Sequence, residues 1–155
     1  MKSLTALLPR RRSLRDRILD NVREGRLQRT LSATTAASVV PLTFEVYLEH
    51  YKGSFGSRWE WLPIACAPPV TAAGIAGVFS ARAARTWLPA TSAVYALNGA
   101  IGAFLHLRGV ARKPGGFKEP IYNLVMGPPL LAPGSLVLVG SIGMLAALMR
   151  REGER

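Results

Sequence analysis

The chain has 155 residues, an apolar fraction of 49%, a formal net charge of +11 and one cysteine, Cys66. This length fits one domain, and a single cysteine excludes an internal disulfide. No charged residue occurs between Glu60 and Arg82 or between Arg85 and Arg108. A soluble helix of that length needs a polar face, so these runs favour an integral membrane protein over a soluble domain.

The first thirty residues form a basic arm with nine Lys and Arg residues. Within this arm, the segment from Ser13 to Arg29 is predicted to form an amphipathic helix whose apolar face carries Leu14, Ile18, Leu19 and Val22. Such a helix lies on the inner membrane surface and is attracted to anionic lipid. The alternative is a solvated tail that only fixes the topology. No aromatic or groove-reading element accompanies the basic residues, so we expect no nucleic-acid partner.

Four transmembrane helices follow, because a bilayer core about 30 Å thick needs about 20 mostly apolar residues in a helix. We predict spans at 31–50, 61–81, 87–107 and within 122–149, which together form a four-helix bundle over residues 31–149. The last span contains Pro128, Pro129 and Pro133, so residues 120–133 are expected to form a surface helix or a shallow re-entrant turn. No convincing internal repeat is found in the sequence.

The distribution of Lys and Arg predicts the orientation of these spans. The basic arm, the short turn at Arg82–Arg85 and the basic tail at 150–155 would all lie on one side of the membrane. Basic loops stay on the cytoplasmic side, so we predict that both termini are cytoplasmic (N-in/C-in), as in a bacterial-type inner membrane.

The two histidines of the chain, His50 and His106, are the first candidate site. Each lies nineteen residues after the start of its predicted span, His50 counted from Leu31 and His106 from Trp87, so both should lie at about the same depth near the outer surface. Two imidazoles on different helices at one depth suit a bis-histidine haem b. The arginines just beyond the third span, Arg108 and Arg112, would then receive the haem propionates.

Two carboxylates extend this region into a second candidate site. Glu45 and Glu49 are one helical turn apart, so they share a face of the first span. Together with His50 and His106 they form a predicted metal site, suited to a divalent ion such as iron. Glu45 lies inside the hydrocarbon, where an acid is costly and is a functional candidate by default. Its alternative role is structural, as a partner of a nearby basic residue.

No motif for nucleophilic catalysis or zinc binding is present, so we do not expect an enzyme. The spans are rich in small residues, which let helices approach closely within the bundle or against another subunit. We therefore predict a structural or accessory subunit of a larger membrane complex, or a homo-oligomer. One alternative is a haem- or metal-binding redox subunit that uses His50 and His106. Another is a small transporter or membrane enzyme that uses Glu45.

Overall fold

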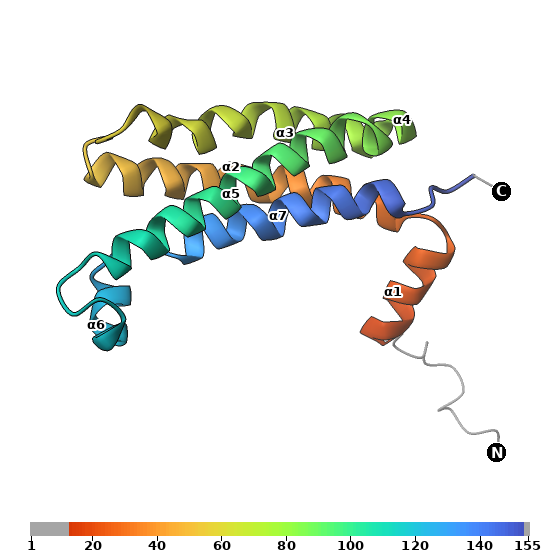
Figure 1. Ribbon diagram of the computed structural model, residues 1–155. Helices are drawn as coiled ribbons and strands as arrows, with labels where there is room; N and C mark the ends of the chain where they lie inside the picture. The colour runs from red at the N-terminus through yellow and green to blue at the C-terminus, as the bar shows by residue number, and fades with distance from the viewer. Residues whose placement is uncertain (1–12, 154–155) are drawn as a thin grey trace, which may run out of the picture.

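The computed structural model describes residues 13–153, and every secondary-structure element in that part of the chain is a helix (Figure 1). In chain order the α-helices are α1 (Leu14–Arg23), α2 (Leu27–Lys52), α3 (Leu62–Phe79), α4 (Ala81–Arg85), α5 (Trp87–Ala111), α6 (Pro120–Val125) and α7 (Leu131–Leu148). Two short 3-10 helices, η2 (Arg58–Trp61) and η3 (Gly116–Lys118), lie in the loops. The all-α prediction is confirmed for these residues. The basic residues at 1–12 and Arg155 lie outside them.

Three helical segments are long and apolar enough to cross a bilayer, namely Leu27–Lys52, Arg58–Phe79 and Ala81–Ala111, with 26, 22 and 31 residues. They contain the first and third predicted spans and all but the last two residues of the second, 61–81. Their length and composition are those of an integral membrane protein. The fourth helix, α7, is equally apolar but shorter. At about 1.5 Å per residue its 18 residues extend for only about 27 Å.

The fourth predicted span lies within 122–149, after a surface helix or turn at 120–133. In this stretch of the structure, α6 ends at Val125 and α7 begins at Leu131. Pro128 and Pro129 provide no backbone donor between them. A Cβ atom at Gly127 would overlap the carbonyl oxygen of Asn123, so the chain turns there too tightly for a larger residue. The charge-free run is therefore longer than the helix within it.

The four long helices lie side by side, and each contacts two of the others. α2 packs against α3 and α7, and α5 packs against α7 and α3 (Figure 1). Buried apolar side chains between them include Val39, Val70, Leu88, Tyr95 and Leu136. In Figure 1, α1, α4 and the C-terminus lie at one end of these helices, which we call the α1 end, and α6 lies at the other, the α6 end.

The hairpin of α2 and α3 closes on a seam of small residues. On α3, a Cβ atom at Gly74 would lie 3.0 Å from the Cβ of Ala36, and one at Gly77 would lie 2.9 Å from the Oγ of Ser32. Both partners belong to α2. These distances leave almost no room for a side chain, so the two backbones approach closely because α3 has glycine at both positions.

The hairpin of α5 and α7 closes on the same kind of seam. A Cβ atom at Gly140 would lie 2.8 Å from the Cβ of Ala96, and one at Gly143 would overlap the Oγ of Ser92. Gly140 and Gly143 are on α7, and Ser92 and Ala96 are on α5. In both hairpins, therefore, two glycines of one helix pack against a serine and an alanine of the other.

This repeated contact reveals an internal repeat that inspection of the sequence does not detect. Ser92 and Ala96 stand sixty positions after Ser32 and Ala36, and the glycine pairs are sixty-six positions apart. The contacts between hairpins repeat too, since α2 packs on α7 as α5 packs on α3. Few residues are identical between the two hairpins. Each hairpin needs only small side chains at these four positions and apolar side chains elsewhere, so the repeat leaves little sequence identity.

The predicted helix from Ser13 to Arg29 is interrupted. α1 begins with a capping box, in which the Ser13 side chain accepts a hydrogen bond from the Asp16 backbone and the Asp16 side chain accepts one from the Ser13 backbone. It ends at Arg23, and Gly25 adopts a left-handed conformation with φ of 74°. The next helix then leaves in another direction, and in Figure 1 α1 projects from the end of the long helices at a steep angle to them.

Candidate functional sites at the two ends of the helices

His50 lies near the end of α2, at the α6 end of the molecule. Its ring is 6.1 Å from the ring of Phe55, and its Nδ1 atom is buried without a hydrogen-bond partner among residues 13–153. A buried polar nitrogen without a partner costs free energy, so this atom is a candidate for an interaction with a ligand.

His106 lies near the end of α5 and is half-buried. Its Nδ1 atom is 2.6 Å from the carbonyl oxygen of Pro129, in the segment before α7. If Nδ1 donates its proton there, Nε2 is left as the acceptor. In the repeat His106 corresponds to Val46. The equal depth of His50 and His106, counted from the span starts, stays a prediction.

The predicted metal ligands are not brought together. Glu49 forms an ion pair with Lys52, one turn along the same helix, while Glu45 is exposed on the surface of α2. Within residues 13–153, no group of three or more His, Cys, Asp and Glu side chains lies close enough to hold a metal ion. The set of Glu45, Glu49, His50 and His106 therefore does not form a cluster in this structure.

The two arginines predicted to bind propionates are exposed at the end of α5. Arg108 and Arg112 precede a loop that the side chains around it hold in shape. The buried Asn123 side chain donates to the carbonyl oxygens of Pro114 and Gly116, and Lys113 donates to that of Met126. The basic residues at this end thus project from an ordered loop.

An aromatic cluster that the sequence analysis did not identify covers His50. It contains Tyr47, Tyr51, Phe55 and Trp61. Phe55 stacks on Trp61 with ring centroids 4.1 Å apart and planes at 12°. In the sequence, aromatic residues are dense on both sides of Gly53. This pattern is also typical of the aromatic belt at a membrane interface, so it does not by itself indicate a cluster.

A shallow groove, open along much of its length, runs along the outer surface of the first hairpin, between α2 and α3. Its volume is about 630 Å³, and its lining residues are Val40, Thr43, Phe44, Tyr47, Ile64, Ala67, Pro68, Thr71, Ala72 and Ile75. The repeat explains why the hairpin opens here. On α5, Gly99 and Gly102 let α7 approach, whereas the equivalent residues of α2 are Val39 and Leu42.

A polar cluster joins the C-terminal tail to the α1 end. Arg151 is buried, and its guanidinium donates to the Gln28 side chain and to the carbonyl oxygens of Gly77 and Val78. The Gln28 amide donates in turn to the carbonyl oxygens of Ala146 and Met149. These side chains satisfy the last carbonyl groups of α3 and α7, which have no partner within their own helices.

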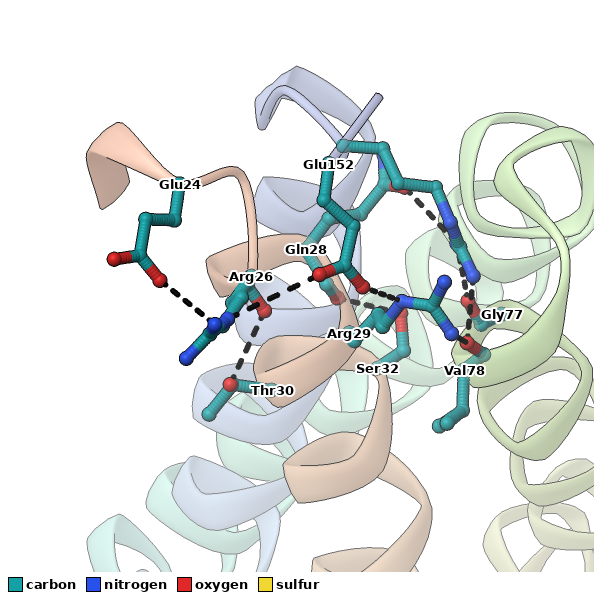
Figure 2. Close-up of polar contacts among 10 residues, drawn as sticks. Glu24, Arg26, Gln28, Arg29, Thr30, Ser32, Gly77, Val78 and Glu152 are labelled. Carbon is teal, nitrogen blue, oxygen red and sulfur yellow. Dashed lines mark hydrogen bonds and ion pairs between the residues drawn. The ribbon is translucent and has the colours of Figure 1, made fainter. Parts of the chain in front are cut away.

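Glu152 continues this cluster toward the start of α2. Figure 2 shows its carboxylate between Arg26 and Arg29, with the Arg29 Nε atom 2.5 Å away and the Arg26 Nε atom 3.9 Å away. The Glu152 backbone also donates to the carbonyl oxygen of Gly25. From the sequence, the basic tail is expected only to fix the topology, because nothing in a sequence shows that Gln28 and Arg151, over a hundred positions apart, are in contact.

The chain was also compared with known proteins. No protein-family model, curated protein or solved structure matches it.

Proposed function

We propose that this chain is a structural or accessory subunit of a membrane complex, with four spans and both termini on the cytoplasmic side. The three long apolar helices support the membrane location. The position of α1, α4 and the C-terminus at one end supports a common side for both termini (Figure 1). That end also carries the basic arm, which favours the cytoplasmic side of an inner membrane.

We further propose that α1 rests on the inner surface of the membrane. Its apolar residues Leu14, Ile18, Leu19 and Val22 are all exposed, and they lie along one face. A short helix of this kind, lying across the spans, buries its apolar face between headgroups and acyl chains. The basic residues of the arm would attract anionic lipid to the same surface.

The observation that carries the subunit proposal is the outward position of Glu45. This residue is exposed on α2, seven residues, or about 10 Å, before Lys52. Its equivalent in the second hairpin is Leu105, a lipid-facing leucine that is 50% exposed. A carboxylate on a surface that faces hydrocarbon is costly unless a neighbour supplies a donor. A polar or cationic group on a helix of another subunit, or of a second copy, would supply it.

Replacing Glu45 by leucine, the residue at the equivalent position, should therefore weaken assembly without weakening the fold. A polar contact between helices in a membrane is worth about 1–2 kcal/mol, which corresponds to roughly a tenfold loss of the assembled form. The measurement is the size distribution of the protein extracted from its native membrane in a mild detergent, with Phe104→Leu on lipid-facing α5 as the control. A wild-type protein that runs as a monomer, or a Glu45→Leu assembly as stable as the wild type, contradicts the proposal.

A haem-binding redox subunit is the second candidate function, and the orientation of His106 favours it. A histidine that donates Nδ1–H to a carbonyl oxygen presents Nε2 to a metal, which is the usual arrangement around histidine ligands. His50 would be the other ligand. The group would supply electron transfer, and Arg108 and Arg112 would hold its propionates.

An absorption spectrum tests this candidate. If His50 and His106 are haem ligands, the purified protein shows a Soret band, and His50→Ala and His106→Ala each shift or remove it. A featureless spectrum with no stoichiometric iron excludes this function, as does a Soret band that both variants retain.

A further inference from the structure

Phe55 occupies the centre of the aromatic cluster at the α6 end. Its ring stacks on Trp61 and also lies 5.6 Å from Tyr47 and 6.1 Å from His50. It comes from the loop between α2 and η2, so it reaches the cluster from outside the packed helices. The ring therefore fills a space that the helices themselves leave open.

The loop that delivers Phe55 is strained. Ser54 and Phe55 have φ angles of 58° and 46°, and they are the only non-glycine residues between 13 and 153 with positive φ. Two successive side-chain-bearing residues in the left-handed region cost free energy, which the contacts of the loop must offset. A ligand that displaced the Phe55 ring and let the loop backbone leave this conformation would release the strain.

The His50 ring lies directly beside Phe55 and holds the buried Nδ1 atom that has no partner in the described part of the chain. A planar group in the place of Phe55 would bring a hydrogen-bonding atom within reach of this ring. A carbonyl oxygen suits the position, because a neutral histidine can donate from Nδ1.

The groove of the first hairpin leads to the same place. Tyr47 lines the groove and belongs to the aromatic cluster, so the two are continuous. The groove offers mainly apolar side chains, and the Thr43 hydroxyl already donates a hydrogen bond to the carbonyl oxygen of Val39. It therefore suits a chain that needs no hydrogen bonds and enters from the hydrocarbon.

We propose that this region binds a membrane quinone, meaning a planar carbonyl-bearing ring on an apolar tail. The ring takes the place of Phe55 on Trp61, one carbonyl oxygen accepts a hydrogen bond from His50 Nδ1, and the tail lies in the groove. Phe55 fills the ring position when no ligand is bound. A phospholipid suits the site less well, because its phosphate needs a cation. The nearby Lys52 is already paired with Glu49, and Glu60 adds a second carboxylate nearby.

The probe is a benzoquinone with a ten-carbon tail, added to detergent-purified protein in which Trp59→Phe and Trp87→Phe leave Trp61 as the only tryptophan. We expect saturable quenching of Trp61 fluorescence. His50→Phe keeps the ring volume but removes the nitrogen, and should weaken binding about tenfold, the loss of one hydrogen bond at 1.4 kcal/mol per decade. His50→Gln keeps a donor and should retain most of the affinity. Phe55→Ala should bind at least as tightly as the parent protein.

A matched pair of variants tests the groove. Ala72→Phe fills it and should weaken quenching, whereas Leu138→Phe, the equivalent position on α7, should not. Circular dichroism melts of each variant separate loss of binding from loss of fold. Quenching that rises linearly with quinone and is the same in all variants shows partition into detergent and overturns the proposal. Equal displacement of the quinone by a ten-carbon detergent also overturns it, because the site then recognises only the tail.

Discussion

Replacing Gly140 by alanine should destabilise the fold by about 2–3 kcal/mol, the typical cost of overpacking a close contact. The new Cβ would lie 2.6 Å from the carbonyl oxygen of Ser92 and 2.9 Å from the backbone nitrogen of Ala96. These are backbone atoms of α5, so no side-chain rotation relieves the clash and the two helices must separate. Gly140→Leu should prevent folding altogether.

The other glycines provide a graded control for this prediction. At Gly74, in the first hairpin, a Cβ atom would meet its nearest neighbours at 3.0 Å, so alanine there should cost less. At Gly134 nothing lies within 4 Å, and alanine should be neutral or stabilise the helix by up to about 1 kcal/mol. Thermal unfolding in one detergent, followed by circular dichroism, measures all three. If the three variants unfold at the same temperature, or in the reverse order of temperature, close packing at these glycines is not the source of stability.

Replacing Arg151 by methionine should cost about 2–4 kcal/mol, because hydrogen bonds from a charged donor are worth about 1.5–3 kcal/mol each before relaxation. Arg151 is 6% exposed, and its removal would leave the Gln28 side chain and the carbonyl oxygens of Gly77 and Val78 without this donor. Methionine preserves much of the volume, so the loss reports on polar contacts rather than on a cavity.

Arg150→Ala is the matched control, since Arg150 is adjacent, carries the same charge and is exposed. It should cost clearly less than Arg151→Met, because a contact made by an exposed charged side chain is worth only about 0–1 kcal/mol. A double-mutant cycle with Gln28→Met should show coupling to Arg151→Met of about 1 kcal/mol or more, because the two side chains share one network. Additive effects, or equal losses at Arg150 and Arg151, would mean that the cluster contributes only general charge.

The sequence predicts the elements of this fold much better than their contacts. A lack of charge over twenty residues identifies α3 and α5, because only a helix satisfies its backbone in hydrocarbon. The lack of charge alone does not place the start of the fourth span, and the prolines at 128, 129 and 133 are what indicate a break before it. The amphipathic pattern of Ser13–Arg29 extends past the end of α1 at Arg23, because the conformation of Gly25 depends on the C-terminal residues packed against it.

The candidate sites depend on rotation and on long-range contacts, which residue counting does not supply. The count brings His50 and His106 to one depth, but it does not show which way either ring faces. The role of Arg151 was not predictable because its partners lie on α2 and α3, far away in the chain. The groove between α2 and α3 could not be predicted from the sequence, which shows only that Val39 and Leu42 stand where the second hairpin has glycines.

Cysteine accessibility in intact cells tests the proposed membrane arrangement most directly. With Cys66 replaced by alanine, single cysteines are placed at Lys52, Arg82, Lys113 and Arg150 and are treated with a thiol reagent that does not cross the membrane. Four spans with cytoplasmic termini predict labelling from outside at Lys52 and Lys113 only, and at Arg82 and Arg150 only after the cells are opened. Labelling of Arg150 from outside would mean three crossings, and labelling of Arg82 from outside would contradict the orientation itself.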